Sequence, residues 1–221
     1  MIRALVFDFD GTIIDTETAW YVAFREAYRR HDVDLTLETY SQCIGTSLGL
    51  FNPYEHLITH HGLPIDRVEF RESVRSRHSE LMKHEAVRPG VEAFLEEARA
   101  RGMQLAVASS SSREWVDTYL ERLGLADYFQ CIRTADDVKN VKPNPELYLR
   151  ALDALGVESH EAIAFEDSPN GVRAALAAGM HCVLAPNETT RLLDFPQVGH
   201  RVDSLEELDF GRLIASPSGV I

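Results

Sequence analysis

The chain has 221 residues, of which 45% are hydrophobic and 26% charged, a composition typical of a globular protein with room for one domain and an insertion. Its 22 basic and 35 acidic side chains give a formal net charge of −13, which argues against nucleic acid or an anionic membrane as a partner. An anionic substrate would therefore need a local cation in its binding site.

Cysteine usage and the N-terminal sequence bear on the location of the protein. Cys43, Cys131 and Cys182 are few and widely spaced, which is typical of a reducing compartment. The N-terminal residues lack the basic and apolar regions of a signal peptide, and the sequence contains no long apolar stretch. We expect a soluble cytoplasmic protein. The oligomeric state stays open, and a monomer is compatible with the sequence.

The chain opens with an apolar run, residues 4–7, that is followed by Asp8, Phe9, Asp10 and Gly11. Successive apolar positions bounded by a turn signal predict a strand that is buried on both faces of a parallel sheet. Ligands bind at the carboxyl ends of such strands, and side chains two residues apart point to the same side. Two adjacent carboxylates repel each other, which a hard cation such as Mg²⁺ would offset. The alternative is a pair of loop aspartates that cap the next turn.

Residues 16–85 carry helical signals and no strand pattern. The apolar positions from Trp20 to Tyr28 follow helical spacing after a cap at Asp15 or Thr16. Three further helices are predicted, from Thr36 to near Gly45, from Asn52 to Gly62 and from Pro64 to near His84.

From residue 86 onward, strands and helices alternate. Amphipathic helices separate four predicted strands, at residues 104–108, 128–134, 161–165 and 181–184. A capping box formed by Ser204 and Glu207 predicts a last short helix. This alternation predicts right-handed βαβ units and a parallel sheet that also includes the first strand.

The order of these elements predicts an α/β protein with two domains. We expect residues 1–15 and 86–221 to form the α/β core domain. Residues 16–85 would then be an inserted helical cap domain, placed where loops at the carboxyl edge of the sheet would cover a site.

Polar side chains stand at the ends of three predicted strands. They are Asp8 and Asp10, the serine run that begins with Ser109 and Ser110, and Glu166 with Asp167. Lys142 stands before the helix that precedes the predicted strand at residues 161–165. The acids could hold a divalent ion, while the serine hydroxyl, the backbone amides of the serine run and the lysine could hold an anion. Taken one at a time, these residues read as helix caps, a turn and a solvated lysine. Taken together and in this order, they predict phosphoryl transfer, with an aspartate as nucleophile and Asp10 as general acid and base.

Four motifs resemble the haloacid dehalogenase-like (HAD) hydrolase superfamily, and its β-phosphoglucomutase-like branch in particular. They are Asp8-Phe9-Asp10-Gly11-Thr12, Ser109, Lys142-Pro143 and Glu166-Asp167-Ser168-Pro169-Asn170-Gly171. The resemblance implies a Rossmann-like core, a mobile helical cap and an aspartyl-phosphate intermediate. It also implies that Asp8 is the nucleophile, that Asp10 is the general acid and base, and that Ser109 and Lys142 hold the phosphoryl group. Mg²⁺ would be bound by Asp8, the backbone carbonyl of Asp10 and Asp167, with Glu166 as a further or outer ligand.

Departures from this branch favour hydrolysis of a small phosphorylated metabolite over mutase activity. Trp20 stands where the mutases carry a cap histidine, and Gly45-Thr46-Ser47 is followed by Leu48 instead of a phosphate-binding arginine. A phosphosugar mutase remains the main alternative. A dehalogenase ranks low because its leaving group has no use for the acid Asp10. A non-catalytic phospho-acceptor switch is the third hypothesis, although the helical insertion argues against it.

Two other groups of cap residues have a structural and a functional interpretation. His56 and His60 are one helical turn apart with His61 beside them, a spacing that can bind zinc, but no third ligand stands out and we expect solvent-facing side chains. Trp20 and Phe24 could touch substrate, although their helical spacing favours packing between helices.

Overall fold

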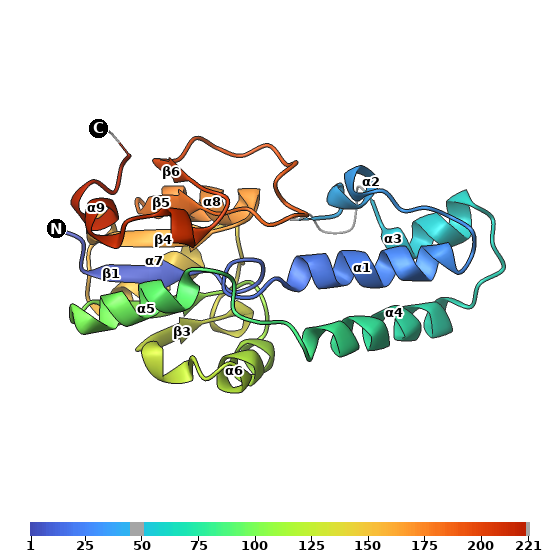
Figure 1. Ribbon diagram of the computed structural model, residues 1–221, viewed down its shortest axis with the longest axis horizontal. Coiled ribbons are helices and arrows are strands. Elements are labelled where there is room, and N and C mark those ends of the chain that lie inside the picture. Colours follow the sequence, from blue (N-terminus) through green and yellow to red (C-terminus); the bar gives the residue numbers. More distant parts are fainter. Residues whose placement is uncertain (45–50, 220–221) are drawn as a thin grey trace. The chain divides into compact units, whose positions relative to one another are not determined.

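The computed structural model describes residues 1–44 and 51–219, and Figure 1 shows the arrangement of their helices and strands. As far as the chain is described, it forms two compact units. The first comprises Met1–Ile14, Ala86–Pro186 and Asp194–Ile221, and the second comprises Asp15–Glu85 and Asn187–Leu193. Each unit has its own core.

A parallel sheet with the strand order β3-β2-β1-β4-β5-β6 forms the centre of the first unit. Its six strands in the described chain are β1 (Ala4–Phe7), β2 (Gln104–Ala108), β3 (Cys131–Arg133), β4 (Ala162–Glu166), β5 (His181–Leu184) and β6 (His200–Arg201). This confirms the predicted α/β fold with a Rossmann-like parallel sheet. The chain runs from β1 outward to β2 and β3 and returns to β4 on the other side of β1, so the topological switch point lies between β1 and β4.

The register of the central strands brings their carboxyl ends to one edge. Phe7 in β1 pairs with Val107 in β2 and with Phe165 in β4. Residues that follow these three positions therefore emerge side by side. Because ligands bind outside the carboxyl ends of strands at a switch point, this edge is the expected position of a site.

Helices join the strands and bury their apolar faces against the sheet. They are α5 (Val91–Ala100), α6 (Arg113–Arg122), α7 (Glu146–Leu155), α8 (Pro169–Ala177) and α9 (Phe210–Ala215). Serine or aspartate caps open three of them, since Ser112, Ser168 and Asp209 accept hydrogen bonds from backbone amides of the first turn.

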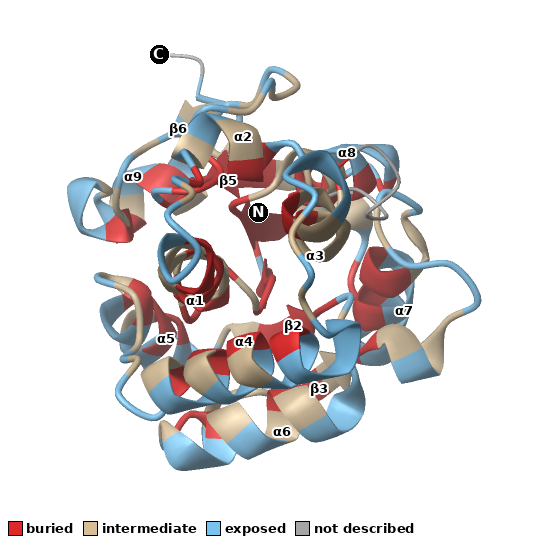
Figure 2. Ribbon diagram, turned by 90° about the vertical axis from the view of Figure 1, so that its right-hand side faces the viewer, coloured by how far each residue is buried: buried red, intermediate tan, exposed pale blue. Residues whose placement is uncertain are grey.

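The core of the first unit is apolar on both sides of the sheet, as Figure 2 shows by the buried residues along the strands and on the inner faces of the helices. Every residue of β1 is fully buried. The rings of Phe7 and Phe165 stack with their centroids 4.5 Å apart, directly below the carboxyl edge. Closely packed apolar side chains therefore support the strand ends.

The second unit is helical in its described residues. It contains α1 (Thr16–Arg29), α2 (Leu37–Ser41), α3 (Pro53–Glu55), the π-helix η1 (His56–His60) and α4 (Arg67–Met82). Asp15, Thr36, Asn52 and Asp66 cap four of these helices. Aromatic side chains dominate the core of this unit: Tyr21, Phe24, Tyr28, Tyr40, Phe51 and Phe70.

Several sequence predictions need correction in detail. β3 is shorter than the predicted residues 128–134, because its ladder with β2 begins only at Cys131. The short edge strand β6 was not predicted. Ser204 opens a 3₁₀ turn, Leu205–Glu207, and α9 begins later with Asp209 as its cap. The Gly45–Leu48 stretch lies outside the described residues.

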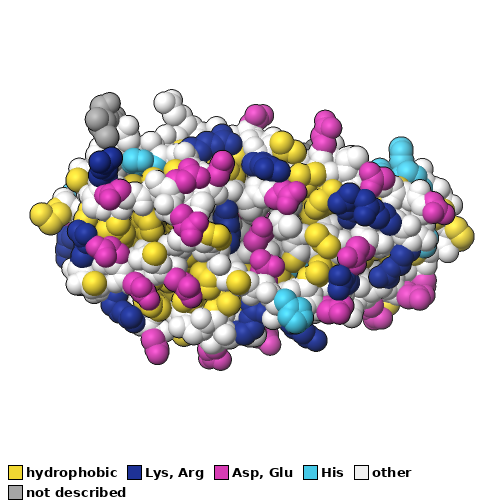
Figure 3. Space-filling model, viewed as in Figure 1, with side chains coloured by type: hydrophobic (Ala, Val, Ile, Leu, Met, Phe, Trp, Pro, Cys, Tyr) yellow, Lys and Arg dark blue, Asp and Glu magenta, His cyan; other side chains and the backbone are white. Residues whose placement is uncertain are grey.

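Charged side chains of both signs are interspersed on the face shown in Figure 3, despite the acidic balance of the chain. Among the helices of residues 1–44 and 51–219, none combines the length and the apolar character that a membrane span requires.

Candidate functional site

The site lies at the carboxyl edge of the first unit, where β1 and β4 end. Asp8 is the first residue after β1, and its backbone amide donates to the carbonyl of Phe165 at 2.9 Å, which continues the ladder by one step. Glu166 is the last residue of β4, and Asp167 follows it. The sheet register thus brings Asp8 close to two acids, Glu166 and Asp167, that are far from it in the sequence.

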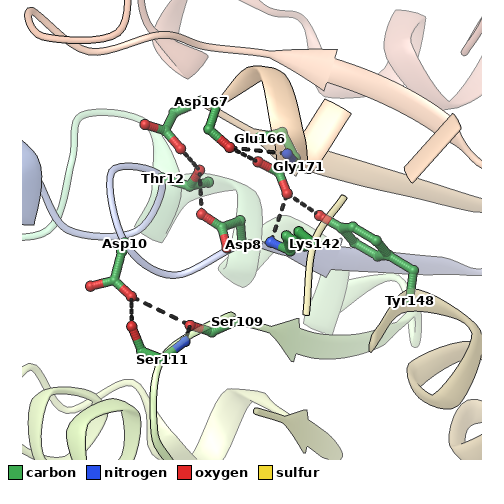
Figure 4. Close-up of polar contacts among 11 residues, drawn as sticks. Asp8, Asp10, Thr12, Ser109, Ser111, Lys142, Tyr148, Glu166, Asp167 and Gly171 are labelled. Atoms are coloured by element: carbon green, nitrogen blue, oxygen red, sulfur yellow. Dashed lines mark hydrogen bonds and ion pairs between the residues drawn. The ribbon is translucent and has the colours of Figure 1, made fainter. Parts of the chain in front are cut away.

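Lys142 connects the two strand ends. Its ammonium group donates to a carboxylate oxygen of Asp8 and, at 2.7 Å, to Oε1 of Glu166 (Figure 4). The side chains are almost fully buried, with exposed fractions of 5% for Lys142, 9% for Asp8 and 0% for Glu166. Although burial alone would lower it, the two carboxylates raise the pKa of Lys142, so the lysine stays charged.

The carboxylate of Glu166 is held from three further directions. The buried hydroxyl of Tyr148 on α7 donates to Oε1 at 2.5 Å, and Ser168 Oγ donates to Oε2 at 3.4 Å. Gly171 in the first turn of α8 lies against the same carboxylate, and a Cβ atom there would overlap it. The glycine of the sequence motif therefore makes room for Glu166.

Thr12 links the first and fourth strands across the site. Its buried hydroxyl lies 3.4 Å from Oδ2 of Asp8 and 3.5 Å from Oδ1 of Asp167. The loop that carries Thr12 is fixed by the guanidinium of Arg88, which donates to the carbonyl of Gly11 and, at 2.8 Å, to that of Ala185. These contacts make the loop after β1 a rigid part of the site.

Carboxylates outnumber ammonium groups within this buried group. Oxygen atoms of Asp8, Glu166 and Asp167 lie within 4.8 Å of one another, and Lys142 forms ion pairs with Asp8 and Glu166. Burial, followed by the charge of Glu166, raises the pKa of Asp8 to about 8 even though Lys142 opposes the shift. An oxygen-rich donor set with this excess fits a hard divalent cation such as Mg²⁺.

The carboxylate of Asp10 has different partners. Ser111 Oγ donates to its Oδ2 at 2.6 Å, Ser109 Oγ lies 3.4 Å from the same atom, and the indole nitrogen of Trp115 donates to Oδ1 at 2.8 Å. Figure 4 shows this carboxylate directed toward the serine loop and away from Asp8. A contribution of Asp10 to metal binding would therefore come from its backbone carbonyl, as the resemblance implies.

The predicted substrate-binding residues take different positions. Ser109 is fully buried at the end of β2, and its backbone amide donates to the carbonyl of Arg133 at 2.9 Å. Ser110 is exposed, and it is Ser111 that reaches Asp10 together with Ser109.

The sequence did not indicate Arg88, Trp115 or Tyr148 as site residues, and it included Thr12 in a motif without giving it a role. Tyr148 belongs to the apolar face of α7 and therefore reads as core. The one available signal was its hydroxyl, since a buried tyrosine usually has a hydrogen-bond partner. Trp115 stands one turn into a helix, where an aromatic side chain ordinarily indicates packing.

Two groups of side chains stand out in the helical unit. Trp20 stacks on His78 of α4 with ring centroids 3.7 Å apart and lies 6.2 Å from Phe24, which fits the packing interpretation. We expected all three histidines to face solvent. His56 is instead half-buried, whereas His60 and His61 are exposed beside it.

Comparisons with known proteins show which chains this one is similar to. The sequence profile of the haloacid dehalogenase-like hydrolases matches residues 5–185. The chain is 45% identical over 214 residues to the protein YhcW of Bacillus subtilis (strain 168), with 97% of each chain covered. It is 33% identical over 181 residues to a phosphatase of phosphorylated carbohydrates from Thermotoga maritima, covering 81% of this chain and 82% of that one. The crystal structure of CbbY from Rhodobacter sphaeroides in complex with phosphate superposes with a TM-score of 0.71 at 32% identity, covering 94% and 96% of the two chains.

Proposed function

The chain belongs to the haloacid dehalogenase-like hydrolase family, and on that premise we propose that it is a Mg²⁺-dependent phosphatase of a small phosphorylated metabolite. The reaction would proceed through an aspartyl-phosphate on Asp8. The observation that carries this proposal is the convergence of Asp8, Lys142, Glu166 and Asp167 in one buried group at the switch point of the sheet. Relatives named for phosphatase activity or crystallised with phosphate support the substrate class.

The proposed role of each residue follows from its contacts. Asp8 is held by Lys142 and Thr12 and would attack phosphorus as the nucleophile. The lysine ammonium and the Ser109 hydroxyl would bind the oxygens of the phosphoryl group. Asp8, Asp167 and the backbone carbonyl of Asp10 would hold Mg²⁺, with Glu166 as a further or outer ligand. A bound Mg²⁺ would neutralise the negative charge that builds up on the transferring group.

Asp10 is proposed as the general acid and base. It would protonate the leaving oxygen in the first step and deprotonate the attacking water in the second. Its carboxylate accepts hydrogen bonds from Ser111 and Trp115, which hold it apart from the buried acids. This separation supports a role in proton transfer that is distinct from metal binding.

Residues 16–85 are proposed to act as the cap that sets substrate specificity. The helical unit and its aromatic core support a separate domain. A cytoplasmic location and the absence of nucleic acid or membrane partners complete the proposal, on the basis of the composition.

The first experiment is a screen for phosphate release over a panel of phosphorylated metabolites, with and without Mg²⁺. We expect release that depends on Mg²⁺, and we expect Asp8→Asn to reduce it by about 10⁴-fold or more, since loss of a nucleophile removes the whole covalent pathway. Asp153→Asn, at an exposed position of α7, is the matched control and should keep full activity. Full activity of Asp8→Asn would remove Asp8 from the nucleophile role.

The same screen separates the two alternatives. A phosphosugar mutase would convert glucose 1-phosphate into an isomer without releasing phosphate. A phospho-acceptor switch would release none from any compound in the panel and would instead keep a long-lived phosphate on Asp8. Release of free phosphate in repeated turnovers contradicts both.

A further inference from the structure

The side chains of His56, His60 and His61 form a compact group in the helical unit, and we propose that these three histidines bind a zinc-type transition-metal ion. Each offers one ring nitrogen, and the three nitrogens lie within 4.8 Å of one another. The residues belong to the π-helix η1 and its C-cap, a part of the chain that the proposed phosphatase chemistry does not use. The proposal therefore stands apart from the catalytic site.

The π-helix explains why three histidines meet. In an α-helix, position i+5 lies about 140° around the axis from position i, so His61 would face away from His56. The wider π turn pairs residue i with i+5 and brings both i+4 and i+5 under residue i. Because η1 spans His56–His60, His60 and His61 both lie beside His56. Single π turns are frequently found at functional sites.

The spacing of the three rings fits tetrahedral coordination. The ring centroids are 4.8 Å apart for His56 and His60, 5.3 Å for His56 and His61, and 5.2 Å for His60 and His61. With a metal–nitrogen distance of about 2.1 Å and a ring centre about 1.1 Å beyond the nitrogen, tetrahedral ligation separates ring centres by roughly 5.2 Å. Rotation about the Cβ–Cγ bond would turn the nitrogens inward while leaving the ring centres almost in place.

A buried tyrosine orients the innermost histidine. The hydroxyl of Tyr28 donates to the carbonyl of Pro53 at 2.6 Å and lies 3.4 Å from Nδ1 of His56. Since that hydroxyl proton is already used, the tyrosine oxygen can accept a hydrogen bond from Nδ1–H of His56. This arrangement favours the tautomer that leaves Nε2 as the metal ligand, in the manner of the outer partners of known metal-binding histidines.

The donor atoms of the group determine which cation fits it. Neutral imidazoles suit zinc, copper and nickel, whereas Mg²⁺ prefers oxygen ligands. The protein would thus carry two cation sites of different chemistry, one made of carboxylates and one made of imidazoles with an open fourth position.

The test is calorimetric titration of the tag-free chain with Zn²⁺ in the presence of saturating Mg²⁺, which keeps the carboxylate site filled. We expect one Zn²⁺ per wild-type chain. The double variant His60→Gln, His61→Gln should bind at least about 100-fold more weakly, because even loss of an outer partner costs roughly 10–100-fold. Both positions are exposed, so the variant should fold normally.

Two controls make the result specific. The matched pair His84→Gln, His160→Gln removes two exposed histidines elsewhere and should bind Zn²⁺ as the wild type does. Asp8→Asn should also retain zinc binding, which separates this site from the carboxylate site and from the proposed function. Equal zinc affinity of the wild type and the His60, His61 variant would overturn the proposal, as would a wild type that binds no Zn²⁺ at micromolar concentration. In a supporting result, NMR signals of the three rings shift together as zinc is added.

Discussion

The two units of the protein differ in how their side chains are placed. In the first unit, the polar residues that matter follow strands whose register is fixed by backbone hydrogen bonds, so Asp8, Glu166 and Asp167 converge at one edge. In the helical unit, aromatic packing sets the position of each residue, and its buried histidine, His78, lies flat against Trp20. In a parallel sheet, the positions of strand ends in the sequence therefore predict which side chains meet. In a helical unit, the same prediction also requires knowledge of how the helices pack.

Substitution of Gly171 by alanine would break the strand-end arrangement most strongly. A Cβ atom at this position would overlap the carboxylate of Glu166, which accepts hydrogen bonds from Lys142 and Tyr148. We expect a loss of about 1–3 kcal/mol in the free energy of unfolding, as in other overpacked sites. We also expect about 10²-fold lower turnover, because displaced catalytic groups are costly. Thermal unfolding and steady-state kinetics on the best substrate measure both effects.

Gly211→Ala in α9 is the matched control. Its Cβ atom would lie at an ordinary distance, 3.4 Å, from Oδ1 of Asp209. Because alanine favours the helix by about 1 kcal/mol over glycine, this variant should be neutral or slightly more stable. Similar behaviour of the two variants would mean that space around Glu166 is not what requires a glycine at position 171.

Trp115→Phe tests the contacts that orient Asp10, the proposed general acid and base. The variant keeps the aromatic packing on Tyr119, 4.4 Å away between ring centroids, and removes the indole donor to Asp10. We expect kcat to fall by about 10-fold with little change in KM, since the carboxylate loses one of the donors that orient it. Because Asp10 is proposed to act in both proton transfers, the loss should appear in kcat for every substrate.

Tyr119→Phe keeps the ring that supports Trp115 and serves as the control. It should leave kcat within the error of the wild type. A Trp115→Phe enzyme with unchanged kcat would show that Ser111 and Ser109 are sufficient to position Asp10. Trp115 would then be a packing residue of α6, as its place in the helix indicated.

The sequence predicted the first unit well because its signals are local. The apolar run before Asp8 and the turn residues after Phe165 both mark strand ends, and parallel pairing brings such ends together without further information. Ser109 was predicted for the same reason. Lys142 does not follow a strand and was predicted from its place before the helix that precedes β4. The edge strand β6 was missed because two residues, His200 and Arg201, carry no periodic pattern.

The contacts that orient the site were not predictable from local patterns. Tyr148 and Trp115 belong to amphipathic helices, where an aromatic residue reads as core whether or not its polar atom reaches a catalytic group. The overlap between Gly171 and Glu166 depends on how α8 packs beside β4. In the helical unit, the π turn at His56–His60 was not predicted, because the spacing of the residues was interpreted with the period of an α-helix.

A pH experiment tests the helical side of the comparison and has the smallest expected effect. His78 is 2% exposed and stacks on Trp20. Burial lowers its pKa from 6.5 to about 4, with a hydrogen bond to the backbone of Thr16 acting in the opposite direction. Between these two pH values the unfolded chain binds a proton that the folded chain does not. The stabilisation that comes from keeping His78 neutral is therefore fully present above pH 6.5. It is lost as the pH falls from 6.5 toward 4, which should lower the free energy of unfolding of the wild type.

His78→Phe keeps an aromatic ring against Trp20 and removes the titration, so its stability should fall less steeply over the same range. We expect the difference in Tm between variant and wild type to grow by about 2–4 °C from pH 7 to pH 5.5, which corresponds to about 1 kcal/mol for a chain of this length. His84→Gln changes an exposed histidine and should follow the wild-type profile. Parallel profiles for His78→Phe and the wild type would mean that the folded protein accommodates a charged His78. The stacked pair would then be open enough to admit water, and the helical unit would lack the dry, aromatic interior that distinguishes it from the charged edge of the sheet.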